Sequence, residues 1–293
     1  MGQTTGISWT DHTFNPHIGC SKVHAGCAHC YAERDFDTRR GVANWGPHGT
    51  RIVTSEANWR QPLKWNREAE AAGERRRVFS ASLADVFEDW KGPLGGATRD
   101  WTSLDDVRRE LFAVIDSTPW LDWLLLTKRP ENVPRMWPTR FTGDDVGKPD
   151  GFEIRRENVW LGTSVSDQET ADRMIPDLLK CRDLSPVLFL SAEPLLGSLN
   201  FRWAKWQEFS DTPGGSTDEL DGLRRLDWVI AGGESGPGFR FVDPDWLRVL
   251  RDQCEAGDVP FFFKQWSGSN PKTLGKVLDG REWCEFPNVG VSV

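Results

Sequence analysis

The stretch Val187-Leu188-Phe189-Leu190-Ser191-Ala192-Glu193 decides the fold, because it is a short apolar run that ends in a carboxylate. A nearly continuous apolar run of this length is typical of a strand that is buried on both faces of a parallel sheet. Five more runs of this kind lie at residues 78–82, 123–128, 159–164, 228–234 and 261–265. The chain is therefore predicted to contain six core strands.

Helical patterns separate several of these strands. Residues 104–117 carry an apolar stripe that includes Leu104 and Val107, behind a candidate cap at Ser103, and residues 167–179 and 245–254 have the patterns of two more helices. Strands that alternate with helices predict βαβ units and an α/β fold with mainly parallel strands. We expect residues 1–293 to form one domain, with surface loops at 143–151 and at about 201–225.

Polar residues stand where the apolar runs stop. The carboxyl ends of parallel strands meet at one face of a barrel or open sheet, which is where active sites are built. Six strands that all end in polar groups therefore predict a polar pocket, although a polar residue after a strand is commonly just the chain reaching water. The strand-end residues are Ser82 with Asp85, Lys128, Thr163 with Ser164, Glu193, Glu234, and Lys264 with Gln265.

Composition narrows the classes of function. The net charge of −8 argues against an extended cationic track for duplex nucleic acid, although the run Arg75-Arg76-Arg77 could form a local basic patch or a solvated face. The 16 Trp residues could supply a stacking surface, but Trp also packs ordinary cores. No apolar run is long enough to span a membrane and the start lacks a secretory pattern, so we expect a cytoplasmic protein.

The first 48 residues hold all five histidines, and residues 20–30 hold three of the six cysteines. Cys27 and Cys30 are spaced to direct thiolates at one site, and Cys20 can join them from a glycine-containing loop. Soft thiolates select zinc or iron–sulfur clusters. A three-thiolate cubane leaves one iron open, whereas zinc would need a fourth ligand such as His17, His24 or His29. The spacing alone leaves both readings open.

Three cysteines that end in Cys27-Ala28-His29-Cys30-Tyr31-Ala32, ahead of a series of βα units, resemble the cluster loop of the radical S-adenosylmethionine (SAM) superfamily. That loop usually has three residues between its first two cysteines, and here there are six. The whole chain resembles more closely a phage- and mobile-element-associated three-Cys-motif family of unknown function, of the DUF5131 type. The motifs that carry this second resemblance are Trp9-Thr10, Asn15-Pro16, Gly19-Cys20-Ser21, residues 26–32, 191–197, 231–236 and 263–266.

The resemblance implies a partial TIM-like (β/α)6 barrel in which Cys20, Cys27 and Cys30 hold a [4Fe-4S] cluster and SAM chelates the open iron. It implies reductive cleavage of SAM to a 5′-deoxyadenosyl radical that abstracts hydrogen, with an electron donor of the flavodoxin or ferredoxin type and a partner protein encoded nearby. The phage association suggests a nucleobase, nucleotide or nucleic acid as substrate. The opposing reading is a zinc-stabilised binding or nuclease-accessory protein without radical chemistry.

The resemblance also suggests roles for the residues around the cluster. His29 stands where the superfamily commonly has an aromatic residue near the adenine, and Tyr31 is a further candidate cofactor contact. Ser80, Ser82 and Asp85 are candidates for the SAM amine, and Thr163 and Ser164 for the ribose. Glu193, Glu234 and Lys264 are the candidate catalytic residues, and for all of these the plainer reading is strand-end capping. Cys181, Cys254 and Cys284 are expected to be packing residues, although one could donate a hydrogen atom.

Overall fold

A computed structural model of the protein describes residues 5–96, 101–141, 152–153, 155–202, 204, 219–270 and 273–289. The loop expected at 143–151 lies outside the described residues, as does most of the excursion expected at 201–225. Within the described residues, no helix is both long and apolar enough to cross a membrane.

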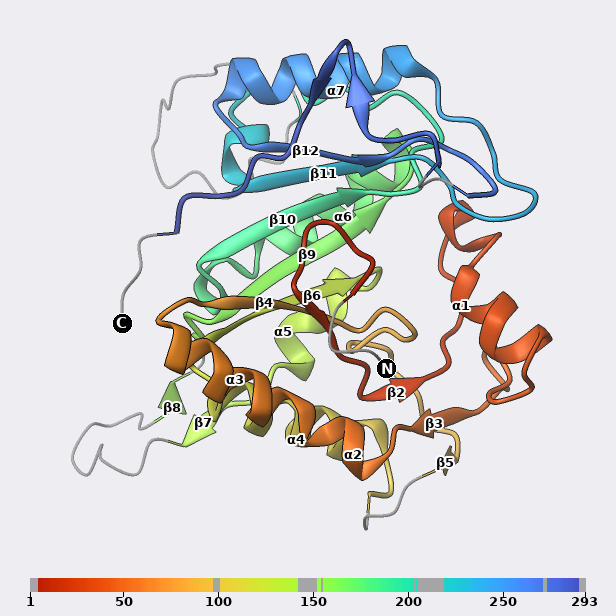
Figure 1. Ribbon diagram of the computed structural model, residues 1–293, viewed down its shortest axis with the longest axis vertical. Coiled ribbons are helices and arrows are strands. Elements are labelled where there is room, and N and C mark those ends of the chain that lie inside the picture. Colours follow the sequence, from red (N-terminus) through yellow and green to blue (C-terminus); the bar gives the residue numbers. More distant parts are fainter. Residues whose placement is uncertain are drawn as a thin grey trace.

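The central sheet has seven strands in the order β1-β4-β6-β9-β10-β11-β12, and every neighbouring pair is parallel. It is curled and open, so the expected partial TIM-like barrel is confirmed (Figure 1). All six predicted strands belong to this sheet. The strands are β1 (His12–Thr13), β4 (Arg76–Ser80), β6 (Leu121–Thr127), β9 (Val159–Val165), β10 (Val187–Ala192), β11 (Trp228–Gly232) and β12 (Phe261–Gln265).

The seventh strand, β1, is a correction to the prediction of six. It has only two residues, His12 and Thr13, which pair with Val78 and Phe79 of β4. Neither residue belongs to an apolar run, so the sequence contains no local strand signal at this place. The pairing depends on a partner strand more than 60 residues away, which is why only the tertiary structure reveals it.

Alternate residues of each strand enter two different cores. In β10, Leu188 and Leu190 belong to the larger core that the helices cover, whereas Phe189 belongs to a smaller cluster inside the curl. Trp9 and Trp228 also lie in the inner cluster. The centroid of the Trp9 ring is 4.7 Å from the centroid of the Phe79 ring and 6.3 Å from that of the Trp228 ring. Each such side chain contributes about 1.5–3 kcal/mol by its burial. These tryptophans pack a core, which is the plainer of the two readings of the Trp excess.

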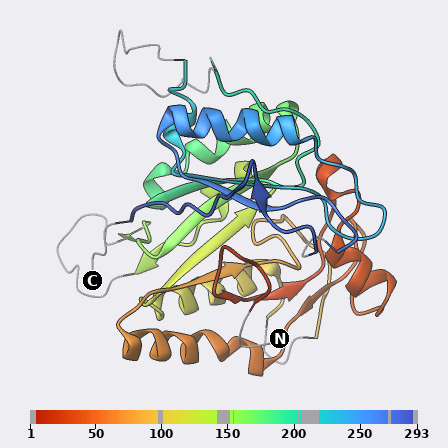
Figure 2. The same cartoon turned by 45° about the horizontal axis from the view of Figure 1, so that its top comes forward.

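Helices cover the outer face of the sheet (Figures 1 and 2). The helix α4 (Leu104–Asp116) begins at the expected cap, because Ser103 Oγ accepts from Asp106 N and the Asp106 side chain accepts from Ser103 N. The helices α6 (Gln168–Leu179) and α7 (Pro244–Gly257) also match the sequence patterns. A further helix, α3 (Gln61–Ala72), was not expected, since its polar sequence buries only Pro62, Trp65 and Ala69.

Short elements complete the described chain. The three-stranded sheet β2-β3-β5 joins β2 (His17–Ile18), β3 (Arg51–Val53) and β5 (Leu94–Gly95), and it carries the chain into the cysteine loop. The remaining strands are β7 (Arg140–Phe141), β8 (Phe152–Glu153), β13 (Val277–Leu278) and β14 (Arg281–Glu282). The short helices are η1 (Ala25–Cys27), α1 (Tyr31–Glu33), η2 (Arg34–Thr38), α2 (Glu56–Trp59), η3 (Pro130–Asn132), α5 (Val133–Met136), η4 (Arg182–Leu184) and η5 (Leu223–Arg225).

Candidate functional site

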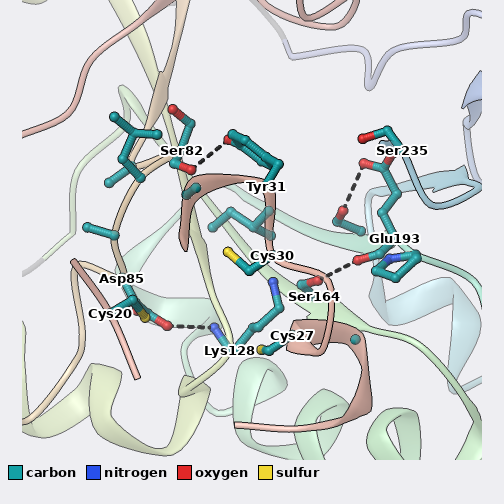
Figure 3. Close-up of a pocket in the computed structure, with 18 of the residues that line it drawn as sticks. Cys20, Cys27, Cys30, Tyr31, Ser82, Asp85, Lys128, Ser164, Glu193 and Ser235 are labelled. Carbon is teal, nitrogen blue, oxygen red and sulfur yellow. Dashed lines mark hydrogen bonds between the residues drawn. The ribbon is translucent and has the colours of Figure 1, made fainter. Parts of the chain in front are cut away.

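A pocket of about 400 Å³ lies at the carboxyl ends of the strands, and the N-terminal segment that carries the cysteines contributes to its lining (Figure 3). Its floor includes Trp9 and Phe79 of the inner cluster. The convergence predicted from the strand ends is confirmed, since the lining includes Cys20, Cys27, Cys30, Asp85, Lys128, Glu193, Glu234 and Lys264.

The cysteine loop is shaped by a glycine and two tight turns. Gly19 has a φ of +114°, and a Cβ at this position would lie 2.4 Å from the Thr50 carbonyl oxygen, so the chain can pass here only as glycine. His24 Nδ1 then accepts from Gly26 N at 3.1 Å and begins η1, which ends at Cys27. Cys30 immediately precedes α1, and its carbonyl accepts from Arg34 N. The loop thereby turns three separated thiols toward one pocket.

The thiols are held in surroundings that suit a metal better than a free thiolate. Burial, followed by the carboxylates of Glu88 and Asp85, raises the pKa of Cys20 to about 12, although Arg129 opposes that rise. Burial also raises the pKa of Cys30. Neutral buried thiols are poor nucleophiles, whereas a bound metal cation deprotonates its thiol ligands outright. The donor set therefore fits a thiolate-ligated metal group.

The arrangement does not resemble a site for a single ion. Among the described residues, no three His, Cys, Asp or Glu side chains come together closely enough to hold one metal ion. A cubane cluster places each thiolate on a different iron, so its ligands stand further apart than those of one zinc ion. Three thiolates are the donor set that an iron–sulfur cubane with one open iron would use.

The three candidate fourth zinc ligands lie in different surroundings. His17 is buried outside the pocket lining, and burial followed by the charge of Arg51 lowers its pKa to about 3. His24 uses Nδ1 as a helix cap. His29 lines the pocket, but its Nδ1 lies 3.0 Å from Glu234 Oε2. Among the described residues, His24 Nε2 is buried without a hydrogen-bond partner, so His24 keeps one nitrogen that could ligate zinc.

Asp85 lies at the pocket with every oxygen already partnered. Its Oδ1 accepts from Thr127 Oγ1 at 2.7 Å and from Phe87 N, and its Oδ2 accepts from Lys128 N and from Arg129 Nη1 at 3.0 Å. Burial alone would raise the pKa of Asp85, but Arg129 and these hydrogen bonds hold it below its usual value. The Asp85 carboxylate is thus ionised, and its hydrogen bonds hold Thr127, Lys128 and Arg129 in place at the pocket wall.

Glu234 is a second ionised carboxylate at the pocket. Burial would raise its pKa, but the side chain and backbone N–H of Arg240, followed by His29, lower it to about 2. Arg240 donates from Nε at 2.9 Å and from its backbone N at 2.8 Å, and Arg240 Nη2 also pairs with Glu234 Oε1. Asp85 and Glu234 are thus two pocket carboxylates whose pKa values are lowered by their partners.

Glu193 and Lys264 form an ion pair across the ends of β10 and β12. Their Oε1 and Nζ atoms are 3.0 Å apart, and Ser191 Oγ donates to Glu193 Oε2 at 3.3 Å. A Cβ on Gly232 would lie 2.7 Å from Glu193 Oε1, so glycine at this strand end leaves room for the carboxylate. The pair offers a carboxylate and an ammonium side by side on the pocket wall.

The strand-end hydroxyl residues divide between the two faces of the sheet. Ser82 and Ser164 line the pocket, and Tyr31, also in its lining, donates from Oη to the Ser82 carbonyl at 2.6 Å. Ser80 and Thr163 are not among the lining residues. They have the same strand parity as Val78 and Leu161 of the helix-covered core, and Thr163 Oγ1 donates to the Thr127 carbonyl at 3.0 Å. The structure therefore separates these two from the candidate SAM contacts.

Several pocket and supporting residues were missed by the sequence analysis. Trp9 and Phe79 form its floor, while Arg51, Glu88 and Arg129 surround the Cys20 side. Arg129 directly follows the strand-end Lys128 and could have been found by the same rule. Arg51 has no comparable signal, because it reaches Glu88 only through the tertiary fold.

The other cysteines lie away from the pocket lining. Cys181 and Cys254 are fully buried in the helix-covered core, which agrees with the expected packing role. Cys284 is partly buried, and Lys276 Nζ lies 3.2 Å from its Sγ.

Comparison with known proteins gives a family and a set of distant structures. A family model described as "Protein of unknown function (DUF5131)" matches residues 4–287. A spore photoproduct lyase variant with bound AdoMet and dinucleoside spore photoproduct is similar at 15% identity and a TM-score of 0.41, over 83% of this chain and 61% of that chain. A second spore photoproduct lyase variant is similar at 14% identity and a TM-score of 0.43, with the same coverage. The chain spans about three fifths of the length of these structures, and no curated protein matches it.

Proposed function

The chain belongs to the DUF5131 family of proteins of unknown function, and we propose that it is a radical SAM enzyme whose [4Fe-4S] cluster is held by Cys20, Cys27 and Cys30. One observation carries the proposal: the three thiols line a pocket at the carboxyl ends of a curled sheet of seven parallel strands. Three thiolates leave one iron of a cubane open, and an open iron can bind a cofactor. When bound, the cluster and SAM would supply a 5′-deoxyadenosyl radical for hydrogen abstraction.

The chain's own residues would bind and orient SAM beside the open iron. Ser82 and Ser164 line the pocket and are the proposed contacts for the polar groups of SAM. Their hydroxyls now bond the Asn15 side chain and the Glu193 carbonyl, so SAM would share or replace these hydrogen bonds. His29 and Tyr31, next to Cys30, are the proposed neighbours of the adenine. Asp85 would act by holding Lys128 and Arg129 in place, because its oxygens are already partnered.

The deeper part of the pocket would take the substrate. The Glu193–Lys264 pair on its wall can accept and donate hydrogen bonds at the edge of a flat ring. This pair supports a nucleobase, nucleotide or nucleic acid as the proposed substrate class. Glu193, Glu234 and Lys264 are the proposed catalytic residues on this side.

The reaction needs electrons from outside the chain. We propose an electron donor of the flavodoxin or ferredoxin type and a cytoplasmic setting, where thiolate ligands stay reduced. A partner protein encoded nearby would strengthen binding to a nucleic acid, because a chain with a net charge of −8 offers little electrostatic attraction to phosphate groups.

Metal analysis after anaerobic purification tests the proposal. A radical SAM enzyme should be brown and carry about four irons and four sulfides per chain. A colourless protein with one zinc per chain would instead establish the zinc-stabilised binding protein. Reconstituted protein should then bind SAM with a change in the spectrum of the cluster.

A further inference from the structure

Four charged side chains are buried together behind Cys20. Arg51 and Glu88 are 0% and 4% exposed, and Arg129 and Asp85 are 12% and 6% exposed. The two positive and two negative charges balance. Such a network is stable only when every member keeps its partner, because one uncompensated buried charge costs several kcal/mol.

Arg51 and Glu88 form the inner half of this network. Arg51 Nε donates to Glu88 Oε2 at 2.7 Å and Arg51 Nη2 to Glu88 Oε1 at 2.8 Å, which is the bidentate geometry of a strong pair. The guanidinium also lies 4.0 Å from the centre of the Trp90 ring. Glu88 Oε1 accepts from Ser21 N at 2.9 Å, so this half anchors the residue after Cys20.

Arg129 forms the outer half and reaches the cysteine itself. Its Nη1 donates to Cys20 Sγ at 3.6 Å and to Asp85 Oδ2 at 3.0 Å. Its Nη2 donates to the Ser21 carbonyl at 2.8 Å and lies 3.3 Å from Glu88 Oε1. One guanidinium therefore contacts the sulfur, the backbone beside it and both carboxylates.

Hydrogen bonds at the end of β6 orient Arg129 toward the cysteine loop. Thr127 Oγ1 accepts from Arg129 N at 2.9 Å, while Asp85 accepts from both Thr127 and Lys128. Pro130 follows and keeps Arg129 out of the helical region, at φ −135° and ψ 56°. The backbone direction of Arg129 is thus set independently of the cysteine loop.

The other two cysteines are held differently. Cys27 and Cys30 lie on turns whose hydrogen bonds run within the segment, such as Cys27 N to the His24 carbonyl and Arg34 N to the Cys30 carbonyl. Cys20 and the residue after it are instead held by charged side chains from β3 and from the segments that follow β4 and β6. The part of the loop at Cys20 is therefore fixed by other parts of the chain, whereas the part from Cys27 to Cys30 is held by hydrogen bonds within its own segment.

We propose that Arg129 is a positioning residue that fixes Cys20 and, through its charged contact with Cys20 Sγ, raises the reduction potential of the cluster. This inference rests on the proposed function. Hydrogen bonds to the sulfurs and local charge set the potentials of such clusters. Reduction makes the cluster and its thiolates more negative by one charge, so a cation at the sulfur stabilises the reduced form more than the oxidised form.

Redox titration of the reconstituted protein, followed by electron paramagnetic resonance, tests this role. Arg129→Met and Arg129→Gln should make one-electron reduction at least tenfold less favourable, a shift of about 59 mV to more negative potential. Arg129→Lys, which keeps the charge, should recover at least half of that shift. Arg135→Met is the matched control: Arg135 is 58% exposed and pairs with Asp89, and its loss should leave the potential unchanged.

The outcomes separate the two proposals. Neutral variants that hold four irons at the wild-type potential would overturn the role of Arg129 and leave the proposed function standing. An equal shift in Arg135→Met, or a full shift in Arg129→Lys, would also overturn it. Loss of iron in both neutral variants with retention in Arg129→Lys would support the positioning role. Wild-type protein that assembles no cluster would end the proposed function and this inference together.

Discussion

Individual residues at the pocket divide into those that are free to meet a ligand and those already committed to the protein. Asp85 has four hydrogen bonds and Glu234 is clamped by Arg240 and His29, so both are ionised groups with defined partners. The cysteines contrast with them, because Cys20 and Cys30 are buried thiols whose pKa values are raised. Burial raises the pKa of Cys181 and Cys254 as well, so the raised pKa does not distinguish the pocket thiols; their place in the lining of one pocket does.

Cysteine substitution should separate the pocket thiols from the others. Cys20→Ala, Cys27→Ala and Cys30→Ala should each lower iron from about four per chain to less than one, because three thiolates are the minimum protein ligation of a site-differentiated cubane. Cys181→Ala and Cys254→Ala are the controls and should keep their iron. Iron and sulfide analysis after anaerobic reconstitution gives the measurement, and dependence on a distal cysteine would show that the ligand set is incomplete.

Neutralising the pocket carboxylates should affect ligand binding more than folding. Glu193→Gln removes the partner of Lys264, and Glu234→Gln weakens the hold on Arg240 and His29, while each keeps nearly the same volume. We expect SAM affinity or turnover to fall at least tenfold in each, measured by calorimetry and product analysis. Glu282→Gln, which breaks an exposed pair with Lys276, is the control. Wild-type values in both pocket variants would remove these carboxylates from the site.

At the scale of elements, strand parity decides which side chains reach the pocket. Ser164 has the parity of the inner face, whereas Ser80 and Thr163 have that of the helix-covered face. Ser82 lines the pocket from the segment that follows β4, where strand parity no longer applies. The helices stabilise this sheet from outside, and their ends carry recognisable caps. Helix α4 has the strongest such cap, since Asp106 accepts from both the backbone and the side chain of Thr102 and Ser103.

The α4 cap should make a pH-dependent contribution to stability. Hydrogen bonds from the Thr102 backbone, and then from the Ser103 and Thr102 side chains, lower the pKa of Asp106 from 3.8 to about 2 despite partial burial. A depressed folded-state pKa stabilises the protein above the unfolded value and loses that effect as the pH falls. Asp106→Asn should therefore cost about 1–2 kcal/mol at pH 7, and the difference should shrink between pH 3.8 and about 2.

Chemical denaturation at several pH values measures this contribution. Ser103→Ala should also cost about 1 kcal/mol at neutral pH, because it removes the reciprocal half of the capping box. An Asp106→Asn deficit that stays constant down to pH 2 would show that shape, rather than charge, accounts for the cap.

On the scale of the whole molecule, one curled sheet unites distant parts of the chain. Pocket residues run from Gly6 to Gln265, so the site needs nearly the complete chain. We accordingly propose that residues 1–293 act as a single domain. The inner aromatic cluster fills the bottom of the curl and leaves the pocket at its open end, which is the end where parallel strands direct their terminal side chains.

Reduced protein with a complete cluster should cleave SAM slowly without any substrate. One electron from the reductant would cleave SAM to methionine and the 5′-deoxyadenosyl radical, and that radical would take a hydrogen atom from buffer components in place of a substrate. 5′-Deoxyadenosine and methionine should therefore accumulate in equal amounts. Chromatography of anaerobic reactions with dithionite measures both products, and Cys30→Ala is the matched negative control. A protein that loads its cluster and binds SAM, yet releases no 5′-deoxyadenosine, would be a sensor and not an enzyme.

The sequence by itself determined the six main strands, the capped helix at 104–116 and the clustering of Cys20, Cys27 and Cys30, because continuous apolar runs, caps and cysteine spacing are local properties of the chain. Only the tertiary structure decided the two-residue strand β1, the faces to which Ser80 and Thr163 turn, and the meeting of Arg51, Glu88 and Arg129 behind Cys20. These features depend on strand register and on partners tens of residues apart, and no local pattern encodes which buried charges will find one another.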